Sequence, residues 1–145
     1  MKLNTINIEE YNNKSISHRT LAMNIANDPL TRSTFYDFNN YIVKVQSGSC
    51  VNKVYVCSKD GRNIGIITLE LLDSKYELSY AIDPNARGYK YGETILNEVS
   101  EYLLHKKGLF PLYLLIKPDN QISKVVASRS GYKKVDNTNN YIRNI

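Results

Sequence analysis

The spacing of apolar residues along the first third of the chain predicts helices. In residues 15–27 and again in 38–45, apolar side chains recur at three- and four-residue intervals, which is typical of amphipathic helices. We expect the first helix to end at Asp28-Pro29, because a residue before proline disfavours the helical conformation. The run YIVKV at 41–45 also fits a strand, so the second segment allows either interpretation.

In the middle of the chain the period changes to that of an antiparallel sheet. Residues 51–58, 64–72 and 76–82 are rich in β-branched and aromatic side chains and are separated by short polar segments. The Asp60-Gly61 pair between two apolar runs is a hairpin signal. We therefore expect three strands joined by tight turns, and residues 3–8 can add a strand before them.

The C-terminal part predicts further helices and strands. Apolar positions share one helical face through 95–103, and 112–116 is a nearly continuous apolar run, typical of a strand covered on both faces. A short helix is expected from 120 to Gly131, followed by a hairpin built from 132–135 and 141–145. The predicted fold class is α/β (α+β), with a mixed, mostly antiparallel sheet and helices on both faces.

Length and composition narrow the class of protein. The 145 residues suit one domain, 1–145. Two cysteines, Cys50 and Cys57, are too few for a disulfide framework, and with two distant histidines they are too few for a zinc site, so no metal is expected. Because the sequence has neither an apolar leader nor 18 consecutive apolar residues, we expect a cytoplasmic protein that does not contact a membrane.

The positive charge is concentrated near the C-terminus. Residues 1–101 carry 11 basic and 12 acidic side chains, whereas 102–145 carry 8 and 2, within a net charge of +5. A basic segment is a feature of nucleic-acid binding. The sequence lacks the aromatic-plus-basic strand pattern of an RNA-binding sheet and any helix-turn-helix signature, so we expect no nucleic-acid partner.

The segment 76–92, YELSYAIDPNARGYKYG, predicts an anion site. A strand is followed by a short turn, and Gly88 and Gly92 flank the start of a helix. Backbone N–H groups at such a junction are unpaired, and the helix dipole adds partial positive charge. Because Arg87 and Lys90 add full charges, the segment is suited to a diphosphate.

Two motifs in this order resemble those of the GNAT superfamily of acetyl-CoA-dependent N-acetyltransferases. The sequence RGYKYG at 87–92 resembles the family's Q/R-x-x-G-x-G/A pyrophosphate loop. The sequence NQIS at 120–123, followed by Gly131-Tyr132, is similar to the N-x-x-S…G-[F/Y] signature of the family's next helix, in the form found in ribosomal-protein N-terminal acetyltransferases. The resemblance covers roughly 50–136.

The resemblance implies acetyl-CoA as co-substrate in a V-shaped cleft between the strand ending at Ile82 and the strand at 112–116. The pantetheine arm would pair with the backbone of the first strand, and the pyrophosphate would lie on amides of the loop. Lys124 and Arg129 can flank its phosphates. The residues that the resemblance assigns to the cofactor are Tyr80, Ala81, Ile82, Arg87, Gly88, Tyr89, Lys90, Tyr91, Gly92, Asn120, Ser123 and Lys124.

The implied reaction is attack of an amine on a thioester, which needs a proton acceptor and a hydrogen donor at the departing sulfur. The resemblance makes Ser123 the candidate acid, and Glu77 is the candidate base, acting through a water. A bulge in the strand would change its parity, so Tyr76 or Glu70 can face the site instead, and Tyr113 can line it.

At two positions the sequence departs from the family pattern. Lys90 replaces the central glycine of the loop; a lysine there can keep the amide direction if its φ stays negative, and its ammonium can reach a phosphate. Ala127 stands where many members place a tyrosine acid. Both departures motivate an alternative function, that of a non-catalytic acyl-CoA-binding or regulatory module.

The leading interpretation is an N-acetyltransferase that moves an acetyl group to a primary amine by direct attack in a ternary complex. A helical region, 1–48, would hold the substrate beside a cofactor-binding core, 50–136. The acceptor classes left open are a protein N-terminus, a polyamine, an aminoglycoside and a lysine. A homodimer formed through sheet edges is a further expectation.

Overall fold

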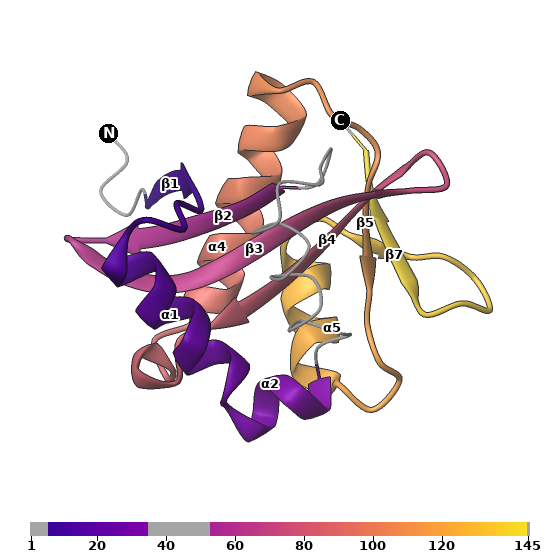
Figure 1. The fold of residues 1–145 in the computed structure, drawn as a ribbon. Coiled ribbons are helices and arrows are strands. Elements are labelled where there is room, and N and C mark those ends of the chain that lie inside the picture. Colours follow the sequence, from indigo (N-terminus) through magenta and orange to yellow (C-terminus); the bar gives the residue numbers. More distant parts are fainter. Residues whose placement is uncertain (1–5, 35–52, 145) are drawn as a thin grey trace.

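A computed structural model describes residues 6–34 and 53–144, and these form a seven-stranded sheet in the order β1-β2-β3-β4-β5-β7-β6 (Figure 1). All neighbouring strands are antiparallel except β4 and β5, which are parallel. The predicted mixed, mostly antiparallel sheet is therefore confirmed. The strands are β1 (Asn7–Glu10), β2 (Lys53–Lys59), β3 (Arg62–Leu72), β4 (Lys75–Ile82), β5 (Leu112–Leu115), β6 (Lys133–Lys134) and β7 (Asn140–Arg143).

Helices cover both faces of the sheet, as predicted. Figure 1 shows α1 in front of the strands and α4 behind them. Leu21 and Ile25 of α1 pack on one face with Ile66, whereas Leu96 of α4 packs on the other with Leu78. The described helices are α1 (Ile16–Ala26), α2 (Pro29–Thr34), α4 (Tyr91–Glu101) and α5 (Gln121–Arg129), with a 3-10 turn at Pro84–Ala86 and a π-helical turn at Tyr102–Lys106 that continues α4.

The three central strands form the predicted meander. Asp60 and Gly61 both have positive φ, 52° and 78°, as a tight hairpin turn requires. The first strand is described over Asn7–Glu10, where it pairs with Tyr55–Ser58 of β2. It overlaps the predicted 3–8 and continues to Glu10, and residues 3–5 lie outside the described residues. The predicted element at 38–45 lies outside the described residues, as does the start of the strand expected at 51–58.

Helix α2 was not predicted, although its start has a recognisable signal. The Asp28 carboxylate accepts hydrogen bonds from the backbone N–H of Thr31 (2.9 Å) and from its hydroxyl (3.0 Å). Asp28 is thus an N-cap, and Pro29 occupies the first helical position, where a missing N–H costs nothing. The Asp28-Pro29 pair ends α1, as expected, and also starts α2.

The sheet opens between its two parallel strands. β4 pairs with β5 only from Tyr76 to Leu78, opposite Leu112–Leu114, and β5 continues in register with β7 alone. Within the described residues, β4 from 79 to 82 has no neighbour on this side. Figure 1 shows the two strands diverging, with α5 at the opening, which confirms the predicted V-shaped arrangement.

Gly65 allows α4 to lie close to the open end of β4. A Cβ atom at this position would lie 2.7 Å from the carbonyl oxygen of Ala81 and 2.7 Å from Cδ1 of Ile95, far inside normal contact distance. Only glycine fits there without movement of strand or helix. The close packing places the N-terminus of α4 beside the opening.

Among the described residues, no helix has the length and apolar character needed to cross a bilayer.

Candidate functional site

A cleft of about 630 Å³ lies between the end of β4, the N-terminus of α4, α5 and the start of α2. The sequence-predicted residues that line it are Tyr80, Ala81, Ile82, Arg87, Gly88, Lys90, Tyr91, Gly92, Asn120, Ser123 and Arg129. Lining residues that were not predicted are Leu30, Thr31, Ala86, Glu93, Gln121, Ile122, Val125 and Val126. The two predicted motifs therefore meet in one cleft.

Two predicted cofactor residues lie off this cleft. Tyr89 is 63% exposed and stacks on Tyr91, with 5.5 Å between ring centroids. The ammonium group of Lys124 donates a hydrogen bond to the carbonyl oxygen of Pro118. Neither residue is among those lining the cleft, although both stand beside residues that do.

The turn before α4 has a left-handed backbone at two positions. Gly88 has φ 91° and Lys90, the N-cap of α4, has φ 59°. The condition of a negative φ at Lys90 is not met, because the chain enters α4 through the conformation for which the family pattern has glycine. Lys90 makes no side-chain capping bond, and the first amides of a helix have no partner within it. The N-terminus of α4 thus presents unpaired N–H groups beside the cleft.

Two cationic side chains of the cleft, Arg87 and Arg129, are paired with carboxylates. Arg87 Nη2 lies 2.5 Å from Asp28 Oδ2, and Arg129 Nη1 lies 3.5 Å from Glu93 Oε1. The hydrogen bond from Arg87 is the main cause that lowers the pKa of the Asp28 carboxyl to about 2, with help from Thr31. Arg87 therefore joins the turn before α4 to the junction of α1 and α2.

A hydroxyl pair links β4 to α5 inside the cleft. The Asn120 side chain caps α5 by accepting a hydrogen bond from the backbone N–H of Ser123 (3.1 Å). Tyr80 Oη donates a hydrogen bond to Ser123 Oγ (3.1 Å). Ala127, on the same helix, is fully buried in the core and does not line the cleft.

Glu77 lies on the opposite face of the sheet from this hydroxyl pair. β3 and β4 pair without a shift from Gly65 to Leu72, so the alternation along β4 is regular. Tyr76 and Tyr80 pack with the core under α4, and Glu77 has the opposite parity, on the face that Ala81 shares with α1. Glu77 precedes the last β4–β5 pair, at Leu78.

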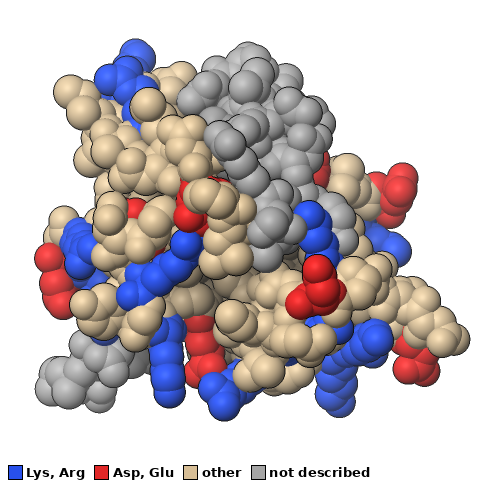
Figure 2. Space-filling model, turned by 90° about the horizontal axis from the view of Figure 1, so that it is seen from below, with Lys and Arg blue, Asp and Glu red and all other residues tan. Residues whose placement is uncertain are grey.

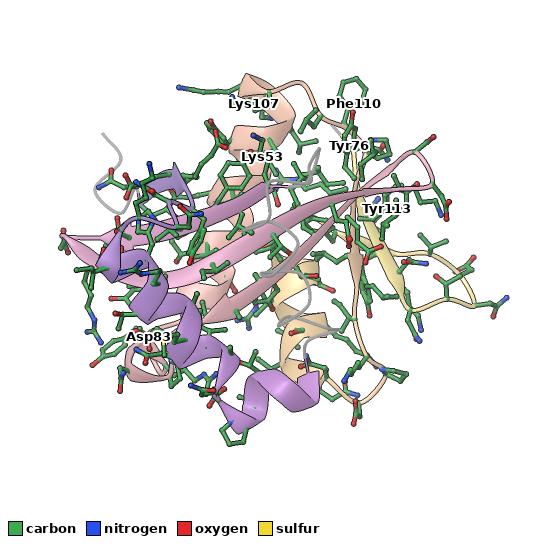
Figure 3. The ribbon with its side chains drawn as sticks, in the orientation of Figure 1. Lys53, Tyr76, Asp83, Lys107, Phe110 and Tyr113 are labelled. Carbon is green, nitrogen blue, oxygen red and sulfur yellow. The ribbon has the colours of Figure 1, made fainter. Side chains whose placement is uncertain are left out.

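Two of the alternatives considered for the site share the face of Glu77. Glu70 is its cross-strand partner on β3 and Tyr113 is its partner on β5, whereas Tyr76 points to the other face. Burial and the neighbouring Glu70 raise the pKa of the Glu77 carboxyl. Asp83 directly follows the end of β4, before the turn that leads into α4. Figure 3 places Tyr113 at the opposite end of the sheet from Asp83.

Charges of both signs are mixed on the surface around this region. Figure 2, seen from below the view of Figure 1, shows basic and acidic side chains interspersed on that face and no continuous basic area.

In residues 6–34 and 53–144, no three histidine, cysteine or acidic side chains are grouped as metal ligands would be.

The profile of the acetyltransferase (GNAT) domain family matches residues 8–133. The chain belongs to this family of acyltransferases, and the family resemblance of its motifs is confirmed. A comparison with the sequences of curated proteins finds no significant match.

Solved structures of GNAT proteins share the fold at low sequence identity. RimL, a ribosomal L7/L12 α-N-protein acetyltransferase, superposes with a TM-score of 0.70 at 14% identity, over 97% of this chain and 91% of that one. Campylobacter jejuni N-acetyltransferase PseH with acetyl-CoA gives 0.67 at 15% identity, over 95% and 96%. The aminoglycoside acetyltransferase AAC(6')-Ib with coenzyme A and kanamycin gives 0.74 at 11% identity, over 97% and 95%.

Proposed function

We propose that the protein is an N-acetyltransferase that transfers an acetyl group from acetyl-CoA to a primary amine by direct attack in a ternary complex. The observation that carries the proposal is a continuous path in the cleft. It leads from the amides before α4, along the unpaired edge of β4, to the Tyr80–Ser123 pair. The GNAT proteins with which the chain shares its fold include structures solved with acetyl-CoA or coenzyme A.

The residues of the cleft suit acetyl-CoA. Among the described residues, no strand pairs with the backbone of Tyr80, Ala81 and Ile82 toward β5, and this backbone offers hydrogen bonds to an extended pantetheine arm. The left-handed turn and the N-terminus of α4 suit a pyrophosphate, because unpaired amides and the helix dipole favour an anion. When bound, acetyl-CoA supplies an activated acetyl thioester.

Glu77 and Ser123 have complementary roles in the proposal. Glu77, on the face of α1, accepts the proton of the incoming amine directly or through a water, and its raised pKa makes the carboxylate a stronger base. Ser123, on the face of α5, donates a hydrogen bond toward the sulfur of the thioester. The amine therefore approaches from the face opposite to that of the thioester, through the opening between β4 and β5.

The acceptor is tested by thiol release from acetyl-CoA with one amine of each class: a peptide with a free N-terminus, an Nα-blocked lysine, a polyamine and an aminoglycoside. We expect turnover with at least one. Glu77→Gln should lower that rate and remove the acid limb of the rate–pH profile, which lies above the ordinary glutamate pKa of about 4.3. Glu70→Gln is the matched control, because it alters the partner carboxylate on the same face.

Two outcomes would contradict this assignment. If Glu70→Gln, instead of Glu77→Gln, removed the acid limb, the base would be Glu70. If the protein bound acetyl-CoA but released no thiol with any amine, the alternative function would be favoured, a non-catalytic acyl-CoA-binding module. The observations behind that alternative are Lys90 in the phosphate turn and Ala127 on α5.

A further inference from the structure

The Tyr80 side chain is held at its ring by packing and at its hydroxyl by the hydrogen bond to Ser123. Its ring packs against the core under α4. A Cβ atom on Gly92 would lie 3.4 Å from Cε2 of Tyr80, an ordinary contact distance, so the ring lies directly beside the start of α4. The hydroxyl then reaches Ser123 Oγ at 3.1 Å across the cleft. The strand, the helix start and α5 thus determine where this hydroxyl lies.

The direction of the hydrogen bond determines what Ser123 can do. A serine hydroxyl has one hydrogen and two acceptor lone pairs. Because Tyr80 donates to Ser123 Oγ, the Ser123 hydrogen is left for donation to a different partner. A hydroxyl that accepts a hydrogen bond is itself a stronger donor, since linked hydrogen bonds polarise one another. The backbone of Ser123 is also held, because its N–H donates to Asn120 Oδ1.

We propose that Tyr80 is a positioning residue that orients and strengthens the Ser123 hydroxyl as the hydrogen-bond donor to the sulfur of the thioester. The inference rests on the proposed acetyl transfer. In that transfer, the amine lone pair forms the C–N bond, the electron pair of the C–S bond stays on sulfur, and the amine proton passes to Glu77. Ser123 donates a hydrogen bond to the sulfur as its negative charge develops, and solvent later protonates the thiolate.

The surroundings of Tyr80 keep its hydroxyl in the donating form. Burial raises the pKa of the Tyr80 phenol above its ordinary value, and the hydrogen bond to Ser123 offsets this only in part. The phenol therefore stays protonated at neutral pH. The chain has no tyrosine at position 127 of α5, so the phenolic group near Ser123 comes from β4 instead.

The test compares Tyr80→Phe, Ser123→Ala and the double variant in thiol release. Tyr80→Phe keeps the ring and removes one neutral hydrogen bond, so we expect kcat to fall by about tenfold, with the KM for acetyl-CoA nearly unchanged. The double variant should be no slower than Ser123→Ala, because Tyr80 acts only through Ser123. A residue with a merely structural role would give losses that add.

Tyr132→Phe is the matched control, because it removes a second Tyr–Ser hydrogen bond. The hydroxyls of Tyr132 and Ser100 lie 2.7 Å apart, and both side chains are buried outside the cleft. We expect Tyr132→Phe to lower the melting temperature while kcat stays the same.

Each outcome separates this inference from the proposed function. An active wild type matched in kcat by Tyr80→Phe would overturn the inference alone, as would additive losses in the double variant. A wild type that is inactive with every amine would overturn the proposed function and, with it, this inference.

Discussion

Lys90 adopts a backbone conformation that suits glycine better than lysine. Its φ of 59° lies in the left-handed region, where a Cβ atom crowds the following carbonyl at a cost of about 1–2 kcal/mol. The chain accepts this strain at the N-cap of α4, beside the cleft. A lysine there also brings an ammonium group to the site where the proposal places a pyrophosphate.

Replacing Lys90 therefore has two separable effects. Lys90→Gly and Lys90→Ala both remove the charge, but only the glycine variant relieves the backbone strain. We expect Lys90→Gly to be more stable than Lys90→Ala by about 1 kcal/mol in chemical denaturation. Both should bind acetyl-CoA more weakly than the wild type at low salt, and by similar factors. Equal stability of the two variants would show that φ at this position carries no strain.

Between elements, the ion pair of Asp28 and Arg87 joins the start of α2 to the turn before α4. The Asp28 side chain caps α2 and is 9% exposed, whereas the Arg87 side chain is 32% exposed and lines the cleft. Leu30 and Thr31 of α2 line the same cleft. The loop proposed for the cofactor and the helix on the other side of the cleft are thus held together by one contact.

The Asp28 carboxylate makes folding stability depend on acid pH. Its pKa is lowered from 3.8 to about 2 in the folded chain, so its stabilisation is present above pH 4 and is lost as the pH falls toward 2. We expect Asp28→Asn to lower the free energy of unfolding at pH 6 by about 1 kcal/mol, after allowance for solvent screening at this partly exposed pair. The difference from the wild type should shrink by pH 2.

Denaturant titrations at several pH values measure this difference. Asp60→Asn is the control, because Asp60 lies in the β2–β3 turn, away from the cleft. A constant difference between wild type and Asp28→Asn from pH 6 to pH 2 would contradict the assignment.

The sequence predicted most elements whose cause is local, although one local signal was interpreted in only one of its two senses. The Asp60-Gly61 turn and the Asp28-Pro29 helix end depend on short-range sterics, and both are found. Helix α2 was missed because an Asp-Pro pair was considered only as a stop signal, although the same pair is also a cap followed by a first-turn proline.

For the candidate site, the sequence predicted much of the cleft lining but not the side-chain contacts within it. Two glycine-containing motifs located most of the cleft, because backbone requirements leave a trace in residue type. Tyr80 and Ser123 are 43 positions apart in the sequence, and Arg87 and Asp28 are 59 positions apart. A local sequence pattern does not predict contacts between residues so far apart. The sequence left the sign of φ at Lys90 open, because the path of the chain into α4 determines it against the preference of the side chain.

At the scale of the whole molecule, the fold divides the proposed chemistry between the two faces of the sheet. Glu77 faces the side of α1, Tyr80 and Ser123 lie on the side of α5, and the strands separate directly after Leu78. The basic C-terminal segment does not form a continuous basic surface on the face shown in Figure 2. We expect the cleft between β4, α4 and α5 to bind acetyl-CoA by its phosphates.

Calorimetric titration of acetyl-CoA into the wild type, Gly88→Ala and Gly61→Ala tests whether the cleft binds these phosphates. Both glycines have positive φ, 91° and 78°, and a Cβ on either would meet no atom within 4 Å, so the substitutions impose similar backbone strain. Only Gly88 lines the cleft. We predict a Kd raised by about tenfold for Gly88→Ala, because a relaxed φ would turn the loop amides away from the pyrophosphate, and an unchanged Kd for Gly61→Ala. Equal affinity of all three proteins for acetyl-CoA would show that the turn at Gly88 does not bind the pyrophosphate.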